Sequence, residues 1–245
     1  MKNFEHGGQI YNSQGLAENF LDFSANINPL GLSDKVIQAL QENFAGIINY
    51  PDSHAVELKN SITRRYNVQQ DNLILLNGAA EFFYLYCNVF RPKKILIPVP
   101  SFSEYQRAAK SAGCEIEFFY TSPKNNFELD IKKLLARNAD SIIIGRPNNP
   151  TGNLISVEKI LLLAEKFSVV VDESFIDFLD TESKLSEGTL QIKKDNPKII
   201  IPTKDIFYDN DNDITAYIDV LNENININNV IIINHFSGEM KAKYI

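Results

Sequence analysis

The chain is poor in cysteine and in long apolar runs, and each shortage excludes a class of protein. Cys87 and Cys114 are the two cysteines among the 245 residues, and no CxxC or Cys/His spacing accompanies them, so we expect neither a disulfide framework nor a zinc module. No apolar stretch approaches the roughly 18 residues of a membrane span, and the N-terminal MKNFEHGGQ lacks the apolar core of a signal peptide. Both observations predict a cytoplasmic protein.

Positive charge is also scarce. The 24 basic residues are outnumbered by 31 acidic ones, which gives a net charge of −7. An acidic surface argues against nucleic acid or an anionic membrane as the main partner, because both attract basic proteins. The composition therefore predicts no nucleic-acid or membrane partner.

Several ligand signatures are missing as well. Neither GxGxxG after a first strand nor GxxxxGK[ST] occurs, which counts against a doubly wound nucleotide-binding protein. The stretch DNDND (209–213) invites comparison with a calcium loop, but Ile214 and Val220 stand where such a loop needs glycine and glutamate. We therefore expect a solvated loop at this stretch and no metal site.

Short apolar runs alternate with longer amphipathic segments over most of the chain. Such alternation predicts an α/β fold with a mostly parallel sheet flanked by helices. Ser33 is the expected N-cap of the first helix. The expected strands cover 72–78, 94–102, 114–121, 140–150 together with a turn, 168–178 and 196–202, with a further candidate at 230–234; the expected helices cover 34–44, 54–67, 79–90, 103–113, 127–138 and 151–167.

Polar and turn-forming residues follow the expected strands, where ligands bind in open parallel sheets. Asp172 ends VVVDE, and a buried carboxylate is costly unless it is paired, so it is either a cap or solvated acid, or an acid held for a cationic partner such as a protonated ring nitrogen. Asn148 and Asn149 in RPNNPTGN form either an Asx-turn or a ligand loop. The helix start after NGAAE (77–81) offers N–H groups suited to phosphate, and Phe102 is either core or a face for a flat ring.

Seven motifs follow one another along the chain: HGG (6–8), SANINPLG (24–31), YPD (50–52), NGAAE (77–81), PVPSFSEY (98–105), RPNNPTG (146–152) and VVVDESFIDF (169–178). Their order resembles that of the fold-type I pyridoxal-phosphate enzymes within the class I/II aminotransferases. The resemblance extends over about residues 5–201 and is closest to the branch of threonine-phosphate decarboxylase and histidinol-phosphate aminotransferase. The HGG start and LDFSANINPLG look more like the decarboxylase of cobalamin biosynthesis.

The resemblance implies a site for pyridoxal 5'-phosphate in a PLP-transferase-like large domain. Asp172 would face the pyridine nitrogen and keep it protonated, and Asn149 would hydrogen-bond the phenolic oxygen of the cofactor. Phe102 would stack on the ring. The backbone of Gly78, Ala79 and Ala80 would hold the cofactor phosphate.

The same resemblance implies a partner subunit and a class of substrate. Tyr50 would reach the cofactor phosphate of the neighbouring subunit, which implies a homodimer with shared active sites. His6, Asn28 and Gly31 would lie near the phosphate or carboxylate of a phosphorylated amino acid. The expected divisions are an N-terminal arm (1–33), the large domain (34–201) and a divergent tail (202–245).

The chain departs from the family pattern within the large domain. Ala80 stands where the family usually has Thr, Ser or Asp, so one side-chain donor to the phosphate is lost. Phe175 replaces the tyrosine with which aminotransferase relatives contact the ring oxygen, although a phenylalanine suits the decarboxylase branch.

The largest departure follows NPKIII. Lys204 in IPTKD is the candidate for the Schiff-base lysine, but Pro202 and Asp205 are unusual neighbours for it. No arginine occurs after Arg146, so the family's C-terminal arginine has no counterpart, and the small C-terminal domain is expected to be missing or replaced.

Two interpretations therefore remain open for the function. The first is a PLP-dependent decarboxylase or aminotransferase that acts on a phosphorylated amino acid. The second is a truncated, catalytically impaired relative that binds PLP or merely dimerises and lacks the Schiff-base lysine. Spectroscopic titration with PLP separates them.

Overall fold

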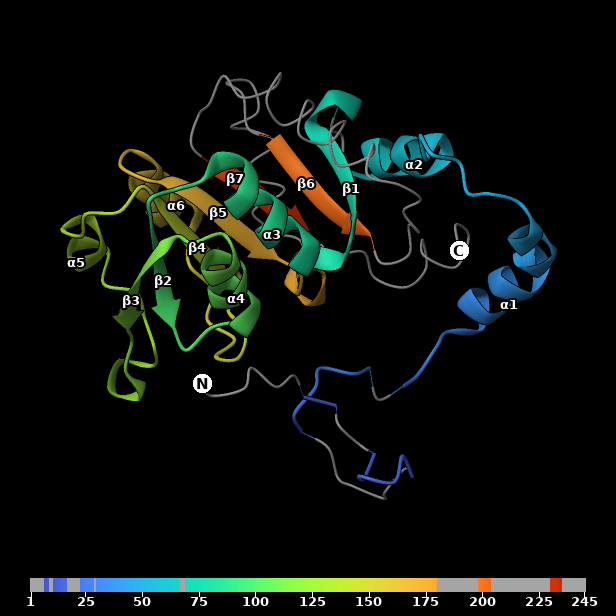
Figure 1. Cartoon of the computed structure of the whole chain (residues 1–245), viewed down its shortest axis with the longest axis horizontal. Helices are drawn as coiled ribbons and strands as arrows, with labels where there is room; N and C mark the ends of the chain where they lie inside the picture. The colour runs from blue at the N-terminus through green and yellow to red at the C-terminus, as the bar shows by residue number, and fades with distance from the viewer. Residues whose placement is uncertain are drawn as a thin grey trace.

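The part of the chain before the sheet consists of an extended arm and short helices. The computed structural model describes residues 7–8, 11–16, 23–28, 30–66, 69–179, 198–203 and 230–234. After the arm come α1 (Asp34–Asn43), the 3-10 helix η1 (Phe44–Ile48), α2 (Val56–Tyr66) and η2 (Gln70–Asn72). The Ser33 side chain accepts a hydrogen bond from the Val36 N–H, which confirms the expected N-cap. Helix α1 lies beyond the β1 side of the sheet, farther from the strands than α2 (Figure 1).

A seven-stranded sheet forms the centre of the molecule, in the order β1-β6-β7-β5-β4-β2-β3. All of the strand pairs that the structure describes are parallel, which confirms the predicted α/β fold. Their carboxyl ends therefore share one edge. The strands are β1 (Leu73–Asn77), β2 (Lys94–Val99), β3 (Glu115–Tyr120), β4 (Ser141–Gly145), β5 (Ser168–Glu173), β6 (Lys198–Thr203) and β7 (Val230–Asn234).

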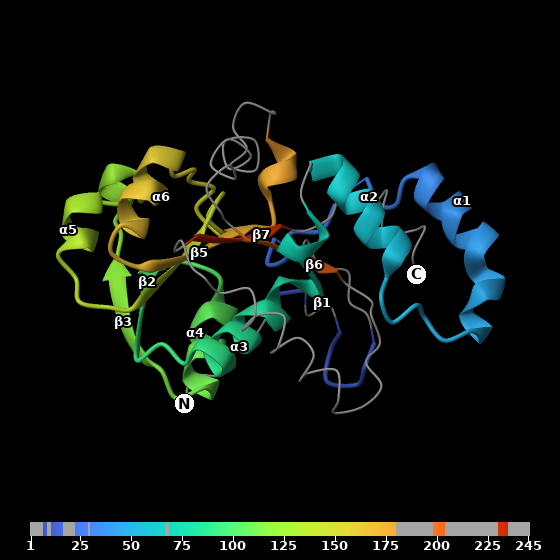
Figure 2. The ribbon, with the colours of Figure 1, turned by 90° about the horizontal axis from the view of Figure 1, so that it is seen from above.

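Helices cover both faces of the sheet. Helices α3 (Gly78–Phe90) and α4 (Ser103–Ser111) lie on one face, and α5 (Ile131–Leu135) and α6 (Val157–Ala164) lie on the other (Figure 2). Successive residues of a strand point to opposite faces, so each strand supplies two cores. Ile143 packs with the α3–α4 side, whereas Ile142 and Ile144 pack with the α5–α6 side. This alternation explains why the strands read as continuous apolar runs.

Strand β7 joins the two parts of the sheet. It pairs with β5 on one side, with Asp172 opposite Ile233, and with β6 on the other, with Ile200 opposite Ile233. The apolar run at 230–234 was expected as a strand candidate, and that expectation is confirmed. Its position in the middle of the sheet was not predicted.

Several expected boundaries are wrong. The helix expected at 127–138 is limited to α5, because the Asp130 side chain caps the Lys133 N–H and Phe127 has a φ of +55°, which no helix contains. The helix expected from residue 151 begins at Val157 as α6. The strand expected at 168–178 ends at Glu173 and is followed by the 3-10 helix η4 (Ile176–Phe178); a further short helix, η3 (Pro123–Asn125), follows β3. Within the described residues, no helix is long and apolar enough to cross a membrane.

Candidate functional site

Asp172 is a buried carboxylate at the carboxyl end of β5. One of its oxygens accepts a hydrogen bond from the Tyr105 hydroxyl at 2.7 Å, and the other accepts from the backbone N–H and hydroxyl of Ser174, at 3.0 and 2.5 Å. These donors are neutral, and no lysine, arginine or histidine of the described chain forms a salt bridge with Asp172. Burial raises the pKa of the carboxyl, and the hydrogen bonds from Ser174 and Tyr105 oppose that rise. A cationic group placed against Asp172 would therefore be bound strongly.

Tyr105 holds Asp172 and belongs to an aromatic group. Burial, together with the charge of Asp172, raises the pKa of the Tyr105 phenol well above its ordinary value, so the hydroxyl remains a donor. Its ring lies edge-on to that of Phe102, with centroids 5.7 Å apart, and to that of Phe83 of α3, at 4.6 Å. Sequence reasoning did not single out Tyr105. Its spacing of three residues from Phe102, across the start of α4, is the signal that could have found it.

The loop after β4 separates the roles of its two asparagines. The Asn148 amide donates to the Pro100 carbonyl at 3.0 Å and to the Thr151 hydroxyl at 2.8 Å, so Asn148 builds the turn. The half-buried Asn149 side chain makes no hydrogen bond to any residue that the structure describes. The loop can therefore be both a turn and a ligand loop, because the Asn148 amide shapes the turn and leaves the Asn149 amide available to a ligand.

Gly145 allows this loop to approach Tyr105. A Cβ at Gly145 would lie 3.0 Å from the Asn148 Cα and 3.4 Å from the Tyr105 hydroxyl. Gly145 is also paired with Asp172 in the sheet. The loop, the tyrosine and the carboxylate therefore meet at one point, at which a larger side chain would push them apart.

A buried ion pair fixes the two ends of the same loop. The Arg146 guanidinium donates to the Glu173 carboxylate at 3.1 Å and to the Ile155 carbonyl at 2.8 Å, and the Arg146 N–H donates to the Asp172 carbonyl at 2.7 Å. The side chains of Arg146 and Glu173 are only 4% and 0% exposed. Burial lowers the pKa of Arg146, and the charge of Glu173 opposes that shift. Sequence reasoning missed this pair, although both residues directly follow or end an apolar run.

The N-terminus of α3 presents backbone N–H groups at the end of β1. Gly78, the first residue of the helix, has a φ of +81°, a conformation that favours glycine. The Asn77 N–H is already bonded to the Glu81 carboxylate at 2.5 Å, which leaves the donors of Gly78, Ala79 and Ala80 at the helix start. Phe83, one turn further on, contacts Tyr105 and so connects this helix start to Asp172.

A second group of predicted residues lines an open hollow of about 540 Å³. Asn28, Asn149 and Phe175 share its wall with apolar side chains of the arm, including Phe23. The Asn28 amide also closes a turn, since it donates to the Gly31 carbonyl at 3.0 Å and accepts from the Leu30 N–H at 3.0 Å. Gly31 has a φ of +72° within this turn. The structure thus brings Asn28 and Gly31 together and brings Asn28 to the hollow beside Asn149.

Other predicted residues are not brought to either group. Tyr50 is 89% exposed. A Cβ at Gly7 of the HGG motif would collide with the backbone of Ser24, so this glycine allows a close approach within the arm. His6 lies outside the described residues.

Lys204 also lies outside the described residues, directly after β6. Thr203, the last residue of β6, is paired with Asn77 of β1. The neighbour of Asp172 on that side of the sheet is Ile233 of β7. The carboxyl end of β6 therefore lies beside the start of α3. Strand β7 separates β6 from β5, which carries Asp172.

Comparisons with known proteins agree with the motif order. The family model of aminotransferase class I and II matches residues 18–203. Threonine-phosphate decarboxylase of Salmonella typhimurium is 33% identical over 208 residues, which covers 80% of this chain and 56% of that protein. The crystal structure of histidinol-phosphate aminotransferase from Clostridium acetobutylicum is similar with a TM-score of 0.65 and 31% identity, over 90% of this chain and 68% of that one.

A solved structure of L-threonine-O-3-phosphate decarboxylase from Porphyromonas gingivalis is also similar. Its TM-score is 0.53 at 30% identity, over 59% of this chain and 44% of that one. The chain spans about half the length of the curated relatives that it matches.

Proposed function

Because the chain belongs to the aminotransferase class I and II family, we propose that it acts as a pyridoxal 5'-phosphate-dependent enzyme on a phosphorylated amino acid. The reaction that we favour resembles that of threonine-phosphate decarboxylase, and the alternative resembles that of histidinol-phosphate aminotransferase. The observation that carries the proposal is Asp172, a buried carboxylate whose described partners are neutral donors.

The described residues fit this cofactor. A protonated pyridine nitrogen would give the buried Asp172 carboxylate a cationic partner, which the described residues do not provide. The phosphate matches the N–H groups at the start of α3, where the helix dipole also favours an anion. The available amide of Asn149 suits the phenolic oxygen, and the Phe102 ring offers a face for the pyridine.

Pyridoxal 5'-phosphate supplies an electron sink for the bond that is broken at the α-carbon of an amino acid. Asp172 would keep the proton on the ring nitrogen, and Tyr105 would hold the carboxylate in place. Phe102 would exclude water from one face of the ring. The Arg146–Glu173 pair would hold the loop that carries Asn149 in a fixed position relative to β5.

The hollow beside Asn149 is the expected place for the substrate. Asn28 provides polar groups at its wall, whereas Phe175 and Phe23 make the rest of it apolar. His6 and Gly31 keep their predicted roles near the phosphate or carboxylate of the substrate. Decarboxylation breaks the bond between the α-carbon and the carboxylate, whereas transamination breaks the bond between the α-carbon and its hydrogen, so the orientation of the substrate in this hollow would favour one reaction over the other.

We also propose that two copies of the chain form the working unit. Apolar side chains on the arm and on η1 are largely exposed, among them Leu30 at 90%, Phe23 at 88% and Ile48 at 86%. Such a surface needs a covering partner. Tyr50, which follows η1 in the chain, would then reach the neighbouring site. Sedimentation of the PLP-loaded protein would measure the dimer.

We propose the same three divisions of the chain, with a tail that adds a strand to the large domain. Residues 34–201 would form the PLP-binding domain behind an arm at 1–33. The tail at 202–245 would contribute Val230–Asn234 to the sheet of that domain. A cytoplasmic location stays a prediction.

Titration of the purified protein with PLP tests the proposed function. We expect a visible absorbance band that saturates near one cofactor per chain and that borohydride reduction removes. Peptide mapping by mass spectrometry would then identify the modified lysine, and modification of Lys204 is the result that the sequence predicts. Incubation with phosphothreonine would distinguish release of CO₂ from transfer of the amino group to a keto acid.

The second candidate function is cofactor binding or dimerisation without turnover. The separation of β6 from Asp172 by β7 favours it, because Lys204 would have to span that strand to reach a ring held by Asp172. A protein that stays colourless when PLP is added would support this candidate. So would a protein that binds PLP but shows no lysine modification after reduction.

Restoring a hydroxyl at the start of α3 should strengthen PLP binding. Ala80→Thr adds a donor beside the N–H groups that we assign to the phosphate. A hydrogen bond to a charged group contributes about 1.5–3 kcal/mol, so we expect the dissociation constant to fall by roughly tenfold or more. Ala80→Val, which has nearly the same shape without the hydroxyl, is the matched control and should bring no gain in fluorescence titrations.

A further inference from the structure

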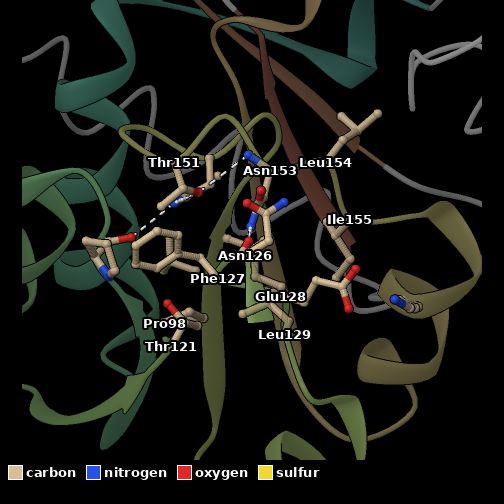
Figure 3. Close-up of a pocket in the computed structure, with 16 residues that line it drawn as sticks. Pro98, Thr121, Asn126, Phe127, Glu128, Leu129, Thr151, Asn153, Leu154 and Ile155 are labelled. Atoms are coloured by element: carbon tan, nitrogen blue, oxygen red, sulfur yellow. Dashed lines mark hydrogen bonds between the residues drawn. The ribbon is translucent and has the colours of Figure 1, made fainter. Parts of the chain in front are cut away.

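A second cavity of about 230 Å³ lies on the other side of the asparagine loop (Figure 3). The residues of the loop are divided between the two hollows. Pro147, Asn149, Pro150 and Gly152 line the hollow described above, whereas Thr151 and Asn153 line this cavity. Asn148 contributes to both. The cavity is therefore separate from the residues that we assign to the cofactor.

The inner part of the cavity is apolar. Ile144 at the end of β4 and Ile155 after the loop are almost completely buried. Phe127 and Leu129 come from the segment after η3 and line the same cavity as Ile155 (Figure 3). Such a lining would hold a small aliphatic or aromatic group.

The polar groups of the inner wall are already bonded. The Thr121 hydroxyl donates to the Val99 carbonyl at 2.9 Å, and the Thr151 hydroxyl accepts from Asn148. The Asn153 amide donates to the Asn126 carbonyl and so ties the two walls together. A ligand would find few free polar groups inside the cavity.

The two charged residues of the lining have opposite signs. Glu128 and Lys159 are both exposed and belong to different elements, the segment before α5 and helix α6. Neither forms a salt bridge with a residue that the structure describes. A ligand of one sign would be attracted by one of them and repelled by the other, whereas a zwitterion would satisfy both.

The segment that carries Glu128 adopts an uncommon backbone. Asn126 and Phe127 have φ values of +52° and +55° in succession, and a bulky residue such as phenylalanine rarely adopts this region. The Phe127 N–H donates to the Ser122 carbonyl at 2.8 Å, which holds the turn. This conformation puts Phe127 in the apolar wall and Glu128 next to it in the lining. Such residues cluster at binding sites, because their conformational cost persists only where the surroundings impose it.

We propose that this cavity binds a free α-amino acid with an apolar side chain. Its ammonium group pairs with Glu128, its carboxylate pairs with Lys159, and its side chain lies among Phe127, Leu129 and Ile155. The volume supports a ligand of this size, because pockets for drug-sized molecules are larger, at roughly 300–1,000 Å³. The proposal does not depend on the cofactor or on the reaction proposed above.

Isothermal titration of the full-length protein with L-leucine tests the site. We expect saturable binding with a dissociation constant in the millimolar range or tighter. Leucinamide lacks the carboxylate and 4-methylpentanoate lacks the ammonium group, so each should bind at least tenfold more weakly. Absence of saturable leucine binding, or equal binding of all three compounds, overturns the proposal.

Variants locate the binding. Glu128→Gln and Lys159→Met should each weaken leucine binding at least tenfold. Glu165→Gln and Lys132→Met make the same changes of charge at exposed positions outside the cavity and should leave it unchanged. Asn28→Ala changes a residue of the other hollow, which does not line this cavity, and should also have no effect on leucine binding. If Asn28→Ala abolishes binding while Glu128→Gln does not, the amino acid occupies the substrate hollow and the proposal is wrong.

Discussion

Asp172→Asn should raise the melting temperature of the cofactor-free protein and lower its turnover with PLP. The carboxylate is buried among neutral donors, and burial raises its pKa, so the folded state disfavours the anion at neutral pH. Asparagine has the same shape without the charge, and the Tyr105 hydroxyl can accept from its amide. A gain of 1 kcal/mol would shift the melting temperature by about 2–4 °C in a domain of this size.

The sign of the pH dependence follows from the raised pKa. A carboxyl whose folded pKa is raised contributes most to stability below its unfolded pKa, near the ordinary value of 3.8, and loses that contribution as the pH rises through the folded pKa. The advantage of Asp172→Asn should therefore be largest at neutral pH and vanish as the pH falls toward that value. Calorimetric melting curves of both proteins between neutral and acidic pH measure it.

Turnover should change in the opposite direction. Loss of the charge that holds the ring-nitrogen proton removes an electrostatic contribution, for which losses on the order of 10²- to 10³-fold are usual. Asp130→Asn is the matched control: this exposed carboxylate caps α5, and hydrogen bonds from the Lys133 backbone and side chain lower its pKa. It should not raise the melting temperature. A lower melting temperature of cofactor-free Asp172→Asn would contradict our account of the site.

Breaking the Arg146–Glu173 pair on one side should be strongly destabilising. Arg146→Met leaves the Glu173 carboxylate buried without its guanidinium, and such losses cost about 3–5 kcal/mol in the free energy of unfolding. The double variant Arg146→Met/Glu173→Leu should recover most of that loss, because an apolar pair avoids the cost of burying charge. Urea denaturation of the two single variants and the double variant gives the coupling.

The recovered double variant should still bind PLP more weakly than the natural protein. The guanidinium also donates to the Ile155 carbonyl and so closes the loop that carries Asn149. Without it the loop is expected to be less ordered, and fluorescence titration should give a higher PLP dissociation constant. Lys133→Met, which breaks the exposed pair with Asp130, is the control and should change neither quantity appreciably. If the losses in the free energy of unfolding of the two single variants add up to that of the double variant, the two side chains do not stabilise the fold as a pair.

The sequence predicted most of the fold for a simple physical reason. Strands buried on both faces need continuous apolar runs, and those at β1, β4 and β5 are bounded by turn residues. Helix ends were harder, because the start of α5 depends on the Asp130 cap and the positive φ of Phe127, which the apolar pattern does not contain.

The site was predicted less completely than the fold. Asp172 and Asn149 were predicted as site residues because Asp172 ends an apolar run and Asn149 lies in the turn after another, where ligands bind in parallel sheets. Tyr105, Gly145 and the Arg146–Glu173 pair were missed because their importance comes from contacts between segments distant in sequence. Lys204 was predicted because Thr203-Lys204 after NPKIII resembles the family's lysine motif, and strand order, which decides what lies beside Asp172, cannot be read from such a motif.

The place of β7 has a consequence for how the molecule folds. Among the described strands, β1 and β6 form one ribbon and β5, β4, β2 and β3 form another, and β7 provides the hydrogen-bonded link between the two. Because β7 is the last described strand along the chain, a ribosome completes it after all the others. The two ribbons must therefore wait with exposed inner edges until Val230–Asn234 arrives, and an unpaired edge is prone to aggregate. Conditions that slow translation or stall the ribosome before residue 230 should therefore increase aggregation of the incomplete chain.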